Sequence, residues 1–224
     1  MKNIIQIAGI HNQQEIELLI SCGVDYIGFP FRLTHHQEDI GETEAAHLIR
    51  LLPDSTKGVL ITYLNDKKEI IKLCRILGVK TVQLHGEIRL ELLQKLKESD
   101  PDVDIFKSII IGNSSWEEIE EMIELFTPLV TAFITDTFDP SSGATGATGK
   151  IHDWNISRKI VQISPKPVIL AGGLNPDNIE AAIDAAQPAG VDVHSGVEDA
   201  QGFKENHRVR QFVTRARMAF DKIR

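Results

Sequence analysis

The sequence alternates short apolar runs with longer amphipathic runs from one end to the other. The short runs are rich in β-branched residues and are bounded by glycine, proline or polar residues, which is typical of strands buried on both faces of a parallel sheet. This pattern predicts eight strands: Ile4–Ala8, Tyr26–Phe29, Gly58–Thr62, Thr81–His85, Ile105–Ile110, Val130–Asp136, Pro167–Ala171 and Val191–Ser195.

Between the predicted strands, apolar residues recur at the spacing of one helix face. Ser115 and Glu118 form a capping-box pattern, Asn175 before Pro176 predicts a helix start, and Gly78 has the position of a helix stop. The predicted helices are Gln13–Ser21, Thr43–Leu52, Lys67–Leu77, Glu87–Glu98, Trp116–Phe126, Asn155–Ile163, Pro176–Ala186 and Val209–Lys222.

Eight strand–helix units without a linker predict a parallel sheet with helices outside it. For a chain of 224 residues, closure of that sheet is the economical arrangement. We therefore expect an α/β protein, a (β/α)8 TIM barrel whose one domain spans residues 1–224. An open, doubly wound sheet is the alternative.

Composition narrows the classes of partner. The net charge is −8, which does not favour nucleic-acid binding, and the basic residues of the last helix, including Arg208, are interpreted as a solvated face. No apolar run approaches the roughly 20 residues of a membrane span. Cys22 and Cys74 have no metal-ligand spacing and are expected to be reduced thiols, which favours a cytoplasmic protein.

In such barrels the functional site lies at the C-terminal ends of the strands. Side chains able to move protons or bind polar groups occur at or just after these ends. They are His11, Arg32, His85, Asp136, Asp192 and His194.

Two glycine-containing loops have the character of a phosphate site. Gly172 and Gly173 lie between a strand and a helix, where backbone amides can approach an anion closely. Ser195 and Gly196 follow the last strand, and barrels often bind phosphate in their last two loops. These four residues predict a phosphorylated ligand.

The segment 141–150 is rich in glycine and ends at Gly149-Lys150. It lacks the spacing of a nucleotide-binding P-loop, and we interpret it as a lid over a substrate, with Gly149 as a further candidate phosphate contact. His35 and His36 are adjacent, and adjacent residues of a strand point in opposite directions. We therefore expect no metal site, and the sequence indicates no cofactor.

Together these strand-end motifs resemble the phosphoribosylanthranilate isomerase family, barrels of tryptophan biosynthesis that perform an Amadori rearrangement. The matching motifs keep the family order over almost the whole chain. They are Gly9-Ile10, Gly23–Phe29, Val82–Glu87, Asp136-Thr137, Gly149-Lys150, Asp153-Trp154, Leu170–Pro176 and Val191–Glu198.

The resemblance implies a phosphorylated sugar-type substrate, with a monomer or homodimer as the expected assembly. It also implies an aspartate that protonates the ring oxygen, here Asp136, and a cysteine that removes the C2 proton. The family sequence Lys-Ile-Cys-Gly-Ile reads Gln6-Ile7-Ala8-Gly9-Ile10 in this chain. Ala8 cannot move a proton, a function worth roughly 10²–10⁴-fold in rate.

Two further departures fall at strand ends. Arg32 precedes the position of the family arginine that holds the anthranilate carboxylate, and His194 replaces a small serine. Three hypotheses follow: an isomerase of this family with a different base, a different phosphosugar isomerase, epimerase or lyase, or a non-catalytic protein that binds a phosphorylated ligand. The candidate bases are His11, His35, His36 and His194.

Overall fold

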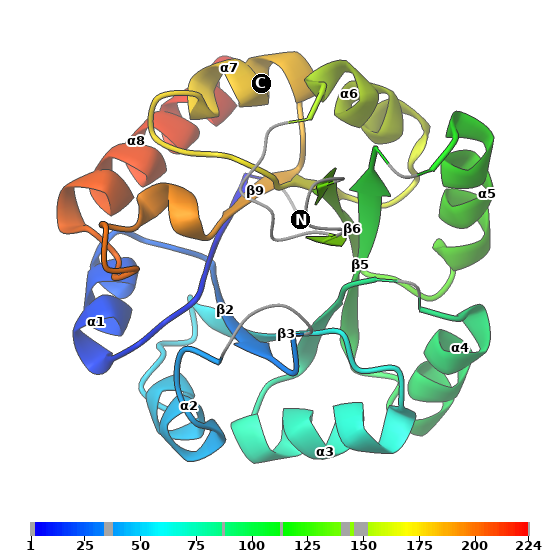
Figure 1. The fold of residues 1–224 in the computed structure, drawn as a ribbon, viewed down its shortest axis with the longest axis horizontal. Coiled ribbons are helices and arrows are strands. Elements are labelled where there is room, and N and C mark those ends of the chain that lie inside the picture. The colour runs from blue at the N-terminus through cyan, green and yellow to red at the C-terminus, as the bar shows by residue number, and fades with distance from the viewer. Residues whose placement is uncertain are drawn as a thin grey trace.

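In the computed structural model, eight parallel strands form a closed barrel surrounded by helices (Figure 1). The structure describes residues 3–33, 38–86, 88–112, 114–139, 144–145 and 152–223. The barrel strands are β1 (Ile4–Ala8), β2 (Tyr26–Phe31), β3 (Lys57–Thr62), β4 (Thr81–Leu84), β5 (Asp104–Ile111), β6 (Ala132–Asp139), β8 (Val168–Leu170) and β9 (Gly190–Val193).

The pairing of β5 with β6 closes the sheet, and the first strand β1 pairs with both β2 and the last strand β9. The predicted barrel is therefore confirmed, and the open sheet is not formed. A two-residue strand, β7 (Ala144–Thr145), pairs antiparallel with the end of β6. It is the described part of the predicted lid, whose remaining residues lie outside the described part of the chain.

Helices alternate with the strands and cover the outside of the barrel, as Figure 1 shows. They are α1 (Gln13–Ser21), α2 (Glu42–Ile49), α3 (Lys67–Leu77), α4 (Leu90–Ser99), α5 (Trp116–Phe126), α6 (Trp154–Ile163), α7 (Ile179–Ala186) and α8 (Asn206–Lys222), with a short 3₁₀ turn η1 (Ser195–Val197) after β9.

Local signals at the helix ends are mostly confirmed. Ser115 and Glu118 form both hydrogen bonds of a capping box, and Gly78 ends α3 with a left-handed φ of 76°. The prediction that a helix starts at Pro176 was wrong, because α7 begins only at Ile179. The side chain of Asn175 accepts a hydrogen bond from the amide of Asp177 at 2.8 Å, so Asn175 forms a turn that precedes the helix.

The apolar core has two parts. The larger one fills the space between strands and helices. The smaller one fills the inside of the barrel with residues such as Tyr26, Val59, Phe106 and Ile134. Packed barrels of this kind leave their C-terminal end for the site. Within the described residues, no helix is long and apolar enough to cross a membrane.

Candidate active site

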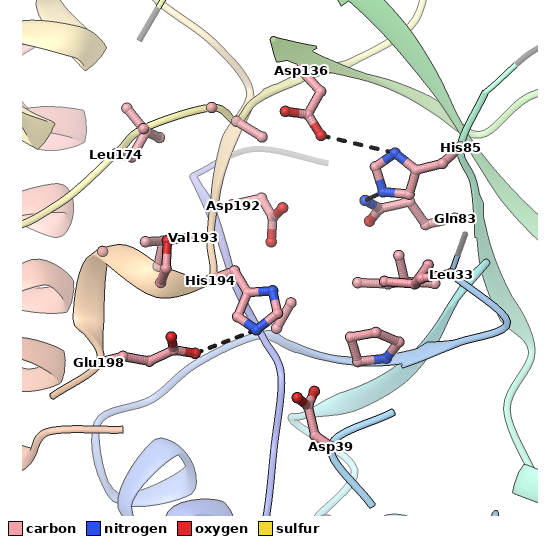
Figure 2. Close-up of a pocket in the computed structure, with 18 of the residues that line it drawn as sticks. Leu33, Asp39, Gln83, His85, Asp136, Leu174, Asp192, Val193, His194 and Glu198 are labelled. Atoms are coloured by element: carbon pink, nitrogen blue, oxygen red, sulfur yellow. Dashed lines mark hydrogen bonds and ion pairs between the residues drawn. The ribbon is translucent and has the colours of Figure 1, made fainter. Parts of the chain in front are cut away.

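A cavity of about 590 Å³ opens at the C-terminal ends of the strands. Figure 2 shows its side chains converging from β4, β6 and β9 toward one centre. The structure brings nine of the predicted site residues to its wall: His11, His85, Asp136, Gly172, Gly173, Asp192, His194, Ser195 and Gly196.

The two glycine loops meet at one side of this pocket. Gly172 and Gly173 have left-handed φ values of 95° and 63°, which only glycine adopts without strain. A Cβ atom on Gly196 would lie 1.8 Å from the carbonyl oxygen of Leu174. The loops after β8 and β9 are therefore in backbone contact, a geometry that allows one anion to touch both.

Arg208 is a pocket residue that the sequence reasoning missed. Its position in α8 suggested a solvated face, yet it lines the cavity and donates a hydrogen bond to the carbonyl oxygen of Gly196 at 2.9 Å. Its Nε atom is buried, makes no hydrogen bond to a described residue and lies 3.9 Å from Oε2 of Glu205. Arg208 therefore adds a permanent positive charge beside the glycine loops, which suits a phosphate group.

A chain of buried amides and one imidazole crosses the floor of the pocket. Gln6 donates to Oε1 of Gln83 at 2.6 Å, and the amide nitrogen of Gln83 lies 2.9 Å from Nε2 of His85. Ser108 Oγ lies 3.0 Å from His85 Nδ1. With the Gln83 amide as donor, His85 carries its proton on Nδ1.

His85 is neutral in the folded protein. Burial lowers the pKa of its imidazole to about 3, and the nearby Lys107 acts in the same direction. Its Nδ1 atom lies 3.8 Å from Oδ2 of Asp136 (Figure 2), so this contact is between a neutral ring and a carboxyl group. The amide of Thr137 donates to Oδ1 of Asp136 at 2.8 Å, which fixes the direction of that carboxyl group.

Asp192 points into the middle of the pocket, between Asp136 and His194 (Figure 2). Burial raises the pKa of the Asp192 carboxyl to about 7, and the negative charge of Asp136 adds to the effect. Two carboxyl groups that share a poorly solvated site tend to hold one proton between them. Asp136 and Asp192 are therefore two carboxyl groups in one pocket, and Asp192 is the one whose pKa burial raises.

The wall formed by the loops after β1 and β9 is rich in charged groups. His194 Nε2 lies 3.3 Å from Oε1 of Glu198, and Glu198 also pairs with the buried ammonium group of Lys204. The ring of His194 lies so close to Gly9 that a Cβ there would be 2.0 Å from its Nε2. His194 is therefore packed at the rim of the pocket.

His11 lies between two carboxylates on the same wall. Its ring nitrogens are 3.6 Å from Glu15 and 3.7 Å from Asp39, and its ring packs on Phe203 at 4.9 Å. Burial raises the pKa of Asp39. Asp39 was not predicted as a site residue, because no pattern in its loop indicated that it would reach the pocket.

The structure does not place Arg32 in the pocket. Its guanidinium pairs with Glu38 and Glu42 at the surface, and its side chain is 45% exposed. The prediction of Arg32 as a substrate contact is therefore corrected: two nearby carboxylates hold it outside. Gly149, His35 and His36 lie outside the described residues. In the part that is described, no cluster of three or more His, Cys, Asp or Glu has the arrangement of a metal site.

Comparison with known sequences gives one family. The family model described as N-(5'phosphoribosyl)anthranilate (PRA) isomerase matches residues 5–215. A Methanosarcina mazei protein named N-(5'-phosphoribosyl)anthranilate isomerase 2 is 38% identical over 222 residues, 98% of this chain and 96% of the relative. An Acetivibrio thermocellus N-(5'-phosphoribosyl)anthranilate isomerase is 31% identical over 221 residues, 96% of each chain.

Solved structures agree with this result. The phosphoribosylanthranilate isomerase of Thermotoga maritima has a TM-score of 0.81 and 27% identity, covering 96% of this chain and 98% of the other. A phosphoribosylanthranilate isomerase in complex with reduced 1-(o-carboxyphenylamino)-1-deoxyribulose 5-phosphate has a TM-score of 0.79 and 25% identity, with the same coverage. The chain therefore belongs to the phosphoribosylanthranilate isomerase family, a family of isomerases.

Proposed function

We propose that this protein isomerises N-(5'-phosphoribosyl)anthranilate, or a closely related phosphoribosylamine, to the 1-amino-1-deoxyribulose phosphate. The observation that carries the proposal is one pocket that combines the two glycine loops with the carboxyl group of Asp136. The glycine loops and Arg208 bind the phosphate, which holds the sugar ring over the floor. No cofactor is needed, because the reaction only moves hydrogen within the substrate.

In this mechanism Asp136 is the general acid. It donates its proton to the furanose ring oxygen as the bond from that oxygen to C1 breaks, which leaves a C1=N iminium group. The neutral His85, 3.8 Å away, keeps the carboxyl group of Asp136 in place without taking its proton. A positioned acid of this kind contributes roughly 10²–10⁴-fold to the rate.

The test follows the loss of phosphoribosylanthranilate fluorescence with purified protein. We expect turnover by the natural sequence and a loss of about 10²–10⁴-fold in kcat for Asp136→Asn. Turnover by the natural sequence that does not exceed that of Asp136→Asn would overturn the proposal.

A second candidate is isomerisation or epimerisation of a different phosphosugar. It is favoured by the position of Arg32 outside the pocket and by the carboxylates of Asp39 and Glu198 on its wall, because acidic side chains do not suit the carboxylate of anthranilate. A thermal-shift series of sugar phosphates, with inorganic phosphate as the reference, would distinguish the two. A non-catalytic binding protein would be stabilised by a sugar phosphate and would leave that sugar phosphate chemically unchanged.

The proposal extends to the cellular location, domain organisation and assembly of the protein. We infer a cytoplasmic protein of one domain over residues 1–224, acting as a monomer or homodimer. The free thiols of Cys22 and Cys74 support the location, since disulfides rarely persist in reducing compartments.

A further inference from the structure

Asp192 lies beside the position where this chain lacks a proton-moving group. β9 runs parallel to β1, with Asp192 in register with Gln6, so Ala8 is only two residues further along the neighbouring strand. Ala8 and Asp192 both line the pocket. Asp136 lies on β6, two strands away from β9 in the order of the sheet.

The carboxyl group of Asp192 makes no ion pair with a described residue within 4 Å, and one of its oxygen atoms has no hydrogen-bond donor. Gln6 lies next to it on β1 and favours its ionised form, and its Oδ1 atom is buried without a hydrogen-bond partner among the described residues. A buried acceptor without a donor is costly to keep. Its retention at the floor of a pocket indicates that it meets a donor when the substrate is bound.

We propose that Asp192 is the general base of the isomerisation and removes the C2 proton in place of the cysteine that Ala8 replaces. This inference rests on the proposed function. Two coupled carboxyl groups can share one proton and divide the roles between them: in the productive form the proton is on Asp136, the acid, and Asp192, the base, is ionised.

The step balances without an added reactant. After Asp136 has protonated the ring oxygen and C1 is an iminium carbon, a carboxylate oxygen of Asp192 takes the proton from C2. The electrons of the C2–H bond form the C1=C2 bond, and the π electrons of C1=N return to nitrogen. The resulting enolamine then gains a proton at C1 and loses one from the C2 hydroxyl, which gives the ketone.

The two candidate histidines within the described residues, His11 and His194, are less suited to this role. His11 is enclosed by Glu15, Asp39 and the ring of Phe203. His194 is packed over Gly9 with Nε2 directed at Glu198, at the rim of the pocket. The side chain of Asp192 instead extends from the strand next to β1 toward the pocket centre (Figure 2).

The electrostatic surroundings of Asp192 suit a base near neutral pH. The groups facing it are Asp136 from β6, His85 from the end of β4, His194 from the end of its own strand and Lys204 from the segment before α8. Burial and Asp136 raise its pKa to about 7, while Gln6 and Lys204 oppose that shift. The carboxylate is thus ionised above about pH 7 and is a stronger base than an ordinary aspartate, whose pKa is about 3.9.

The first experiment is Asp192→Asn, assayed with phosphoribosylanthranilate. We expect kcat/KM to fall about 10²–10⁴-fold, while affinity for reduced 1-(o-carboxyphenylamino)-1-deoxyribulose 5-phosphate changes less than about threefold. Asp54→Asn, an exposed aspartate outside the pocket, is the matched control. Asp192→Asn with near-natural turnover overturns this inference and leaves the proposed function intact, whereas a natural sequence without turnover overturns both.

The second experiment adds Ala8→Cys to the natural sequence and to the Asp192→Asn variant. If Asp192 is the base, the new thiol replaces it, so the gain in kcat/KM from Ala8→Cys is larger in the Asp192→Asn variant than in the natural sequence. Equal gains in both backgrounds mean independent effects and refute the assignment.

The pH profile gives a separate readout. The value of kcat/KM should rise through about pH 7, where the carboxyl group of Asp192 ionises. Gln6→Lys should move that limb to lower pH, because an adjacent ammonium favours the ionised carboxyl. An unmoved limb contradicts the assignment.

Discussion

Replacing Gly196 by alanine would place a methyl group where two loop backbones touch. The added Cβ would lie 1.8 Å from the carbonyl oxygen of Leu174, whereas a carbon and an oxygen normally approach to about 3.3 Å at closest. The loops after β8 and β9 would have to separate by roughly 1.5 Å, the difference between these two distances. The partner is backbone, so no side chain can rotate away to make room.

The expected consequences are a loss of stability and a loss of phosphate binding. Overpacking of this kind costs about 1–3 kcal/mol, which lowers Tm by roughly 2–12 °C in a protein of this size. A displacement of about 1 Å in a positioned site can reduce the rate about 10²-fold. We therefore expect Gly196→Ala to lose most of the Tm increase given by inorganic phosphate and most of its kcat/KM.

Differential scanning fluorimetry with and without phosphate measures both effects. Gly41→Ala is the control, because a Cβ at Gly41 meets nothing within 4 Å; alanine at this helix N-cap costs up to about 1 kcal/mol but should leave the phosphate response unchanged. If Gly196→Ala kept both the natural Tm and the natural phosphate response, the contact between the two loops would not exist in solution, and the phosphate site built on it would be wrong.

Three other predictions concern single side chains. The pKa of His85 is about 3 in the folded protein and about 6.5 in the unfolded chain, so between these values the unfolded chain binds a proton that the folded protein does not. As the pH falls below about 6.5, the free energy of unfolding should therefore fall by up to about 1.4 kcal/mol per pH unit. Urea titrations of His85→Gln should show a smaller slope. Burial raises the pKa of Cys74 to about 12, so a thiol reagent at pH 8 should label Cys22 in the native protein and Cys74 only after unfolding; native labelling of Cys74 would contradict its burial. Arg32→Ala should change the unfolding free energy by at most about 1 kcal/mol, as exposed ion pairs do, and kcat/KM by less than about twofold; a large rise in KM would show that Arg32 does reach the substrate.

The fold could be predicted because its signals are local. Buried strands and one-sided helices repeat through the chain, and the capping box at Ser115 and the glycine at Gly78 mark helix ends through hydrogen bonds within a few residues. The start of α7 was mispredicted because an Asn side chain that accepts a hydrogen bond from the amide two residues on, as Asn175 does from Asp177, occurs both at helix caps and in turns.

The place of many candidate site residues at the pocket could also be predicted, because a parallel barrel gathers the C-terminal ends of all its strands at one edge. The glycine pair at Gly172 and the residues Asp136 and Asp192 follow from strand position alone. The surroundings of these residues do not follow from strand position. Whether a strand-end group is charged depends on burial and on neighbours brought by other strands, as for the pKa values of His85 and Asp192.

What the sequence by itself determined is the alternation of elements, the barrel and the edge at which the pocket opens. Only the tertiary structure decided that Arg208 faces the pocket, that Arg32 does not, and that Gln6 stands beside Asp192. The physical reason is range: helix and strand periodicity arises between residues a few positions apart, whereas the direction and ionisation of a side chain are set by contacts across the closed barrel, between residues as far apart in the chain as β1 and β9.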